Sequence, residues 1–154
     1  MNTTEQNAAK NTEAQVRRVL DVMNQGKLKQ AIRITATPSQ QPLPKTASKF
    51  GGVPYLPVGE SAPTNASGQP LGMIAQINCA ELPENPIYPP TGMVQFWIGG
   101  GDDWGLGGEN DRRVIYYPQL GEANPNAVAT MNDDEHDIWL PVEHECALEF
   151  VVLE

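Results

Sequence analysis

The segment LGMIAQINC, residues 71–79, carries the pattern from which the fold is predicted most directly. Alternate positions place apolar or small side chains on one face, and these are Leu71, Met73, Ala75, Ile77 and Cys79. The opposite face carries Ile74, Gln76 and Asn78. A period of two is typical of a β-strand, so this segment is predicted to form a central strand of a sheet.

Further strands are predicted on both sides of this segment. Downstream, the apolar runs 93–98 and 113–117 flank a glycine-rich loop at 99–108, which predicts two neighbouring antiparallel strands. The last strand is predicted at residues 146–153, with one face formed by Cys146, Leu148, Phe150 and Val152. Upstream, apolar and polar side chains alternate over residues 32–36, and this strand is predicted to end at Pro38.

Two connecting segments also have recognisable patterns. Gly51 and Gly52 are followed by two prolines, so this stretch cannot form a regular helix and is predicted to be extended and bulged, with Phe50, Tyr55 and Leu56 on it. Residues 78–81 are predicted to form a short capped turn, which Pro83 ends.

One helix is predicted near the start of the chain. Thr12 and Gln15 have the spacing of a capping box, and Gly26 supplies a stop signal, so the helix is predicted at about residues 12–25. Apolar residues recur at helical spacing along one side of it, at Val16, Val19, Leu20 and Met23. This apolar stripe is expected to pack against a sheet. Residues 1–11 are polar and are predicted to be disordered.

Length and composition indicate one small domain. The chain has 154 residues, including 14 Gly and 14 Pro, which favours many short elements over long helices. The predicted fold class is therefore α+β, with a mainly antiparallel β-sheet of five or six strands and one N-terminal helix. Residues 12–154 are predicted to form the single domain.

The formal net charge of −9 disfavours nucleic-acid and anionic membrane partners, because it repels phosphate groups. The same charge attracts basic protein segments, although it can serve solubility alone. A secretion signal and an apolar run of about 20 residues are both absent from the sequence, so a cytoplasmic location is expected. Cys79 and Cys146 are then expected to be buried free thiols.

Several residue clusters contain residue types found in phosphate-binding, metal or catalytic sites, but none is predicted to form such a site. The loop 99–108 lacks the spacing and the lysine of a phosphate-binding loop. Oxygen ligands for Ca²⁺ could come from Asp102, Asp103, Glu109 and Asp111, but the EF-hand spacing is absent. Residues 133–137 and 143–146 contain Zn²⁺ ligand types, including His136, His144 and Cys146, without a known zinc spacing. No metal or cofactor is therefore expected.

A catalytic thiol is the remaining reactive option. Cys79 paired with His136 or His144 would be the candidate nucleophile, but an activated thiolate needs an electropositive surrounding, and nothing basic lies near Cys79 in the sequence. A buried strand cysteine is the preferred interpretation, so the chain is predicted not to be an enzyme.

Four segments in order resemble the YwqG-like family of bacterial proteins of unknown function. They are SKFGGVPYLP at 48–57, PLGMIAQIN at 70–78, ELP at 81–83 and GMVQFWI at 92–98. The resemblance is strong over residues 48–98 and weaker over 30–154. Proteins of this family carry the pattern twice, so the resemblance implies a single YwqG-like repeat here, in a chain that is either a single-repeat member or a truncated one. In both cases a surface that a second repeat would cover is left open, a sheet face or edge at residues 93–98 or 146–153, which leads us to expect a homodimer.

The paired glycines and the strand at 71–78 are also distantly similar to the programmed-cell-death-protein-two and Tsr4 group of ribosomal-protein chaperones. The group's cysteine-rich metal-binding insertions are missing here, so only its chaperone role, the shielding of basic nascent chains, is implied.

These observations together predict a non-catalytic protein- or peptide-binding module, chaperone-like toward basic protein segments. The residues predicted to bind are Tyr55, Gln76, Gln95 and Trp97. The alternative role of the two aromatic residues is core packing. Alternative functions are a toxin-neutralising, immunity-type protein and a hydrolase that uses the region of His136 and His144.

Overall fold

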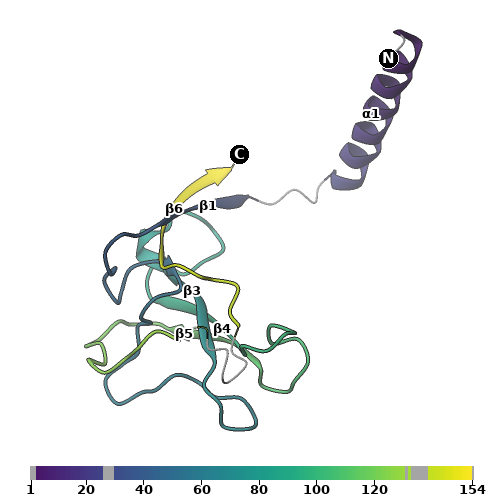
Figure 1. Ribbon diagram of the computed structural model, residues 1–154. Coiled ribbons are helices and arrows are strands. Elements are labelled where there is room, and N and C mark those ends of the chain that lie inside the picture. Colours follow the sequence, from purple (N-terminus) through teal and green to yellow (C-terminus); the bar gives the residue numbers. More distant parts are fainter. Residues whose placement is uncertain (1–2, 26–29, 131, 133–138, 154) are drawn as a thin grey trace. The chain divides into compact units, whose positions relative to one another are not determined.

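The computed structural model describes residues 3–25, 30–130, 132 and 139–153 (Figure 1). The chain divides into two compact units. The larger unit is Ile32–Val151, and the smaller one combines Met1–Ala31 with Val152–Glu154. The larger unit contains most of the sheet and all of the buried core residues, so it positions the candidate site.

The smaller unit contains the helix α1, Thr3–Asn24. It begins well before the predicted helix start at about residue 12. The early segment includes Glu5, Ala8 and Ala9, which are strong helix formers, and this explains why the helix does not start at the Thr12 signal. Its apolar side chains Val16, Val19, Leu20 and Met23 are each at least half exposed. Among the described residues, no helix combines the length and the apolar character of a membrane span.

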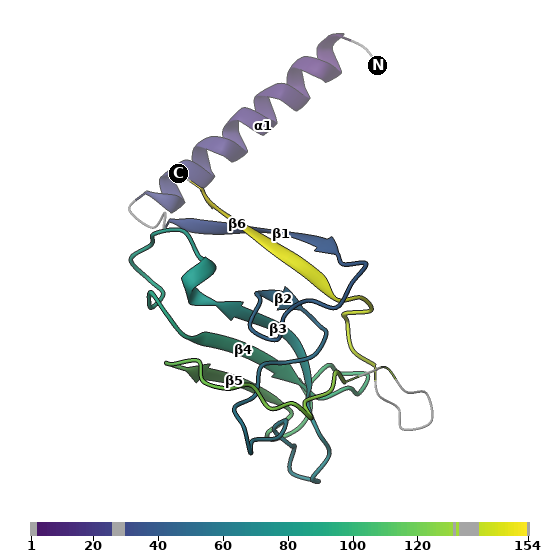
Figure 2. The same ribbon diagram turned by 90° about the vertical axis from the view of Figure 1, so that its left-hand side faces the viewer.

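Six strands form one sheet, which confirms the predicted α+β class with a mainly antiparallel sheet. The strand order is β1-β6-β2-β3-β4-β5 (Figure 2). The strands are β1 Ala31–Pro38, β2 Lys49–Phe50, β3 Gly72–Asn78, β4 Met93–Ile98, β5 Arg112–Tyr117 and β6 Cys146–Leu153. The pairs β2–β3, β2–β6, β3–β4 and β4–β5 are all antiparallel. The predicted hairpin of β4 and β5 and the central place of β3 are confirmed.

A short 3-10 helix, η1 Cys79–Glu81, follows β3 directly. The Asn78 side chain caps it by accepting a hydrogen bond from the Ala80 backbone N–H at 3.1 Å. This confirms the capped turn predicted at residues 78–81.

A register shift in β3 changes which side chains share a face. Met73 lies opposite Trp97, whereas Ala75 lies opposite Phe96, because the pairing shifts between Met73 and Ala75. The prediction that Met73 and Ala75 lie on the same face is therefore wrong, since a bulge reverses the alternation beyond it. As a result Gln76 joins Met73 on the core side of the sheet, opposite Gln95.

The core lies against one face of the sheet. Its central cluster consists of Leu56, Leu71, Met73 and Trp97, each at most 4% exposed. The opposite face is more open: Phe96, Val114 and Tyr116 are exposed on it. The sheet therefore has a covered side and a side with exposed apolar groups.

Candidate functional site

The four residues predicted to bind a partner lie together in the interior. Tyr55, Gln76, Gln95 and Trp97 are each no more than 1% exposed. They are not on a surface in this conformation, so the alternative role of packing describes their positions. Their role in binding stays a prediction.

The glutamine side chains organise the interior through their amide groups. The Oε1 atom of Gln76 accepts hydrogen bonds from the Tyr55 backbone N–H at 2.9 Å and from Nε2 of Gln95 at 3.2 Å. Nε2 of Gln76 donates to the carbonyl groups of Lys45 and Ala47, at 2.6 and 2.8 Å. Gln76 therefore joins the segment before β2 to the segment after it.

Gln95 extends the same network across β4. Its Nε2 atom donates to the Tyr55 carbonyl at 2.5 Å, and its Oε1 atom accepts a hydrogen bond from the Trp97 indole at 3.1 Å. Within the described part of the chain, no buried side-chain nitrogen or oxygen lacks a hydrogen-bond partner. Such saturation is typical of a structural network.

Lys49 is a charged residue in the interior, and its side chain is 0% exposed. Its Nζ atom donates to the Glu145 carboxylate and to the Pro44 carbonyl, each at 3.1 Å. Burial lowers the pKa of Lys49, while the hydrogen bond and charge of Glu145 act in the opposite direction. This ion pair fixes the start of β6 against β2.

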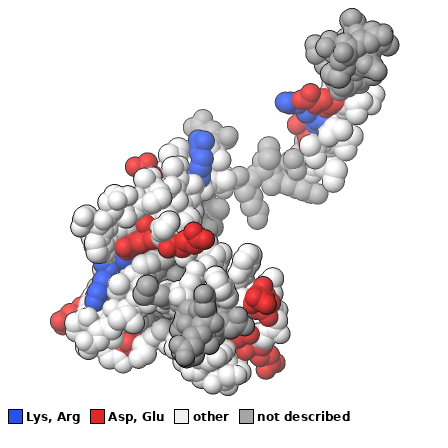
Figure 3. All heavy atoms as spheres, viewed as in Figure 1, with Lys and Arg blue, Asp and Glu red and all other residues white. Residues whose placement is uncertain are grey.

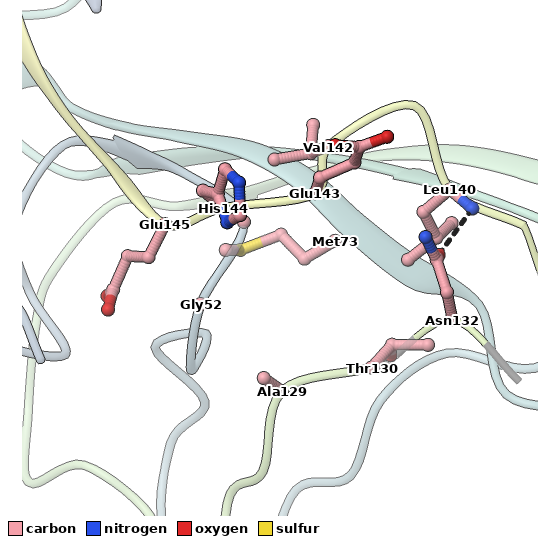
Figure 4. A pocket seen from close by; sticks show the side chains of 11 residues that line it. Gly52, Met73, Ala129, Thr130, Asn132, Leu140, Val142, Glu143, His144 and Glu145 are labelled. Atoms are coloured by element: carbon pink, nitrogen blue, oxygen red, sulfur yellow. Dashed lines mark hydrogen bonds between the residues drawn. The ribbon is translucent and has the colours of Figure 1, made fainter. Parts of the chain in front are cut away.

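A pocket of about 370 Å³ opens beside Gly51 and Gly52, and we name it the diglycine pocket (Figure 4). Both glycines have positive φ, +62° and +72°. A Cβ atom on Gly52 would overlap the Glu145 carboxylate, and one on Gly51 would lie 2.9 Å from Cγ1 of Val142. Two glycines are therefore needed for the segment before β6 to approach this closely. The pocket is lined by Gly51, Gly52, Met73, Ala129, Thr130, Asn132, Leu140, Val142, Glu143, His144 and Glu145.

The lining of the diglycine pocket is divided by chemistry. Met73 and Leu140 are buried and supply apolar surface, whereas Glu143 and His144 are exposed. Among its described lining residues there is no Lys or Arg. Leu140 is held in place by its backbone N–H, which donates to Oδ1 of Asn132 at 2.7 Å (Figure 4). The pocket therefore combines buried apolar side chains with an exposed carboxylate at Glu143.

A second pocket of about 630 Å³ shares part of this wall. Its lining consists of Pro38, Ser39 and Gln40 together with Glu143, His144 and Glu145. The Ser39 backbone N–H donates to the Glu145 carbonyl at 2.8 Å, which joins the end of β1 to the start of β6. Residues 143–145 thus contribute to two neighbouring pockets.

The reactive pairings considered from the sequence are not brought together in the described residues. Cys79 is buried, 3% exposed, and burial raises the pKa of its thiol. It lines a pocket formed by residues between 79 and 90, whereas His144 lines the diglycine pocket. His136 lies outside the described residues. The Cys146 thiol donates to the His144 carbonyl at 3.4 Å, so that contact does not involve the imidazole ring.

In the loop between β4 and β5, Asp103 forms a local hydrogen bond through its side chain and Asp111 through its backbone carbonyl. Oδ1 of Asp103 accepts a hydrogen bond from the Gly105 backbone N–H at 3.2 Å, and the Asp111 carbonyl accepts one from Gly99 at 2.6 Å. Across the described ranges, no group of three or more His, Cys, Asp or Glu side chains could hold a metal ion. The other candidate metal region consists of residues 133–137 and 143–146, and its first part, residues 133–137, lies outside those ranges.

Sequence reasoning missed the apolar part of the diglycine pocket and the buried role of Lys49. In the sequence, Leu140 and Val142 belong to a short apolar run at residues 138–142 that contains Pro141 and has neither strand nor helix periodicity, so the pattern predicted no element there. The paired glycines were a usable signal, because adjacent glycines indicate close approach of another chain segment.

Comparison with known proteins gives one family match. The family described as a domain of unknown function (DUF1963) matches residues 48–154. The matched region begins at Ser48, next to Lys49 and the paired glycines, and includes every described lining residue of the diglycine pocket. No curated protein matches the chain.

Proposed function

Since the chain belongs to the family of this domain of unknown function, we propose that it is a non-catalytic binding module for extended, basic protein segments. The binding site in this proposal is the diglycine pocket. The observation that carries it is the combination of an apolar surface with carboxylates in one open pocket whose described lining contains no Lys or Arg.

A lysine or arginine side chain has the shape and charge for such a pocket. Its aliphatic stem would pack against Met73, Leu140 and Val142, and its charged end would reach the exposed Glu143. Glu145 is already paired with Lys49, so Glu143 is the carboxylate available for a ligand.

The charge of the whole molecule supports the same partner chemistry. The net charge is −9, and acidic side chains are spread over the visible face, whereas basic ones are sparse (Figure 3). A surface of one sign accelerates the encounter with an oppositely charged chain, and this effect weakens as salt is added.

The YwqG-like resemblance and the chaperone-like role are also part of this proposal. Two of the segments that resemble the YwqG-like family contain Lys49, Gly51, Gly52 and Met73, which either line the diglycine pocket or support it. The distant similarity to chaperones of ribosomal proteins points to the same class of partner, since these shield basic chains. We therefore propose a chaperone-like role toward basic segments.

Binding of a fluorescent Arg- and Lys-rich peptide, measured by anisotropy, tests this function. We expect Glu143→Gln to weaken binding by about three- to tenfold, because one charge-assisted contact is lost. Glu109→Gln is the matched control: it removes the same charge from an exposed residue that does not line the pocket, and should change affinity less than twofold.

Two results would contradict the proposal. Equal weakening by both variants would mean that net charge alone attracts the peptide. Failure of every basic peptide to bind, together with tight binding of one folded toxin, would favour the toxin-neutralising alternative.

A further inference from the structure

Strand β5 is an edge of the sheet, because it pairs with β4 alone in the strand order. The Gly99 backbone N–H donates to the Asp111 carbonyl, which identifies these two as a hydrogen-bonded pair of the same ladder. Hydrogen-bonded pairs alternate along an antiparallel ladder, so the backbone groups of Val114 and Tyr116 point away from β4. Within the described residues these groups have no hydrogen-bond partner.

The side chains on this edge are accessible. Val114 is 67% exposed and Tyr116 is 43% exposed, on the face of the sheet opposite the core. An exposed edge strand with apolar side chains is a template for pairing with another strand.

The charges next to this edge are unpaired. Arg113 is exposed and forms no ion pair in the described part of the chain; its guanidinium donates a hydrogen bond to the Thr64 carbonyl at 3.4 Å. Glu60 is likewise exposed and without a cationic partner there. Its carboxylate accepts a hydrogen bond from the Tyr117 hydroxyl at 3.0 Å, so this carboxylate marks the far end of the strand.

We propose that two copies of this chain pair through β5, antiparallel, about a two-fold axis at Ile115. In this register Val114 lies opposite the partner's Tyr116, an aromatic and β-branched pair of the kind that stabilises sheets. The outward backbone groups of these residues then form about four hydrogen bonds between the copies. Symmetry makes every contact occur twice.

The same register explains why the occupant is a second copy. It places Arg113 opposite the partner's Tyr117, on the face where that tyrosine's hydroxyl contacts the partner's Glu60. Each copy therefore supplies the cation that the other lacks, although both copies carry a net charge of −9. A strand from another protein would have to supply both charges at this spacing by chance.

A charge-swap experiment followed by sedimentation velocity at 1–100 micromolar protein, roughly the range in which weak dimers form, tests this pairing. We expect the unmodified chain to sediment as a dimer. Arg113→Glu and Glu60→Lys should each weaken the dimer at least about tenfold, because both copies lose the attraction and gain a repulsion. The double variant should restore it to within about threefold.

Arg33→Glu is the matched control, an identical charge reversal of an exposed residue on the opposite edge strand, β1. It should leave the dimer intact, and thermal unfolding of each variant checks that the fold is retained. A monomer at the highest concentration, a dimer that Arg33→Glu breaks, or a double variant that stays monomeric would each overturn the β5 pairing.

Discussion

The centre of the sheet and its β5 edge differ in whether their polar groups have hydrogen-bond partners within the described chain. At the centre, Gln76 and Gln95 are fully buried, and each donor and acceptor of their amides is matched within the chain. At the edge, Val114 and Tyr116 are exposed and their outward backbone groups are unmatched in the described structure.

This difference separates residues that hold the fold from residues that are free to bind. A saturated interior network is costly to disturb and has nothing left to offer a ligand. An edge strand costs little to change, and gains hydrogen bonds only when something pairs with it. The conspicuous glutamines of the sequence, Gln76 and Gln95, therefore need not be the binding residues.

The largest effect is expected when the saturated centre is broken. Gln76→Leu leaves the Tyr55 N–H and the carbonyl groups of Lys45 and Ala47 without their partner. Each orphaned buried group costs about 1–3 kcal/mol, so urea unfolding should show a loss of about 3–5 kcal/mol. Gln119→Leu, at an exposed position, is the control and should stay within about 0.5 kcal/mol. A loss below about 1 kcal/mol at Gln76 would mean that the network is dispensable.

A smaller effect is expected at the paired glycines. Gly52→Ala forces a side chain into positive φ and pushes the Glu145 carboxylate away from the buried Lys49, so a loss of about 3 kcal/mol is expected. Gly59→Ala is matched in backbone conformation, φ +86°, but its Cβ meets nothing within 4 Å. It should lose only the conformational term, about 1 kcal/mol.

The difference between these two glycine variants isolates the contact with Glu145. It is measured as the difference in the free energy of unfolding under the same conditions. Equal losses would mean that the ion pair of Lys49 and Glu145 tolerates displacement, and that Gly52 is needed only for its backbone conformation.

Much of the fold followed from periodicity in the sequence. The predicted strands at 93–98 and 146–153 have the observed ends, because Gly92 and Gly99 flank the apolar run of the first and apolar side chains alternate through the second. The predicted start of α1 lies too late in the chain, because the capping signal at Thr12 predicts a helix start there although helix-forming residues precede it. The face of Ala75 was assigned wrongly, because a bulge leaves no mark in an apolar run.

The candidate site was less predictable. The structure brings Tyr55, Gln76, Gln95 and Trp97 together in the interior, and residue type alone could not show that they are enclosed. Burial of a glutamine depends on backbone carbonyls such as those of Lys45 and Ala47, which no side-chain pattern encodes. The diglycine pocket combines the paired glycines after β2 and Met73 of β3 with residues 129–130, 132, 140 and 142–145, and these segments, distant in the sequence, meet only in three dimensions.

The smallest effect is expected at the two cysteines. One thiol is buried and the other is partly exposed, so their reactivities compare an interior position with a more accessible one. Cys79 is buried and its pKa is raised by that burial, whereas Cys146 is only partly buried. Thiolate is the reactive form, so at pH 8 a disulfide reagent should label Cys79 at least about tenfold more slowly than Cys146. Single-thiol variants, Cys146→Ser and Cys79→Ala, allow each rate to be measured alone.

The raised pKa of Cys79 also makes the stability of the protein depend on pH. Because the folded-state pKa of Cys79 is raised, the contribution of its thiol is fully present below the ordinary value of 9.0 and is lost as the pH rises through the raised value. Cys79→Ala should therefore cost about 1 kcal/mol at pH 7, from lost packing, and less at alkaline pH. Labelling of Cys79 in the folded protein as fast as that of Cys146 would contradict the core assignment, and would make a nucleophilic role worth testing again.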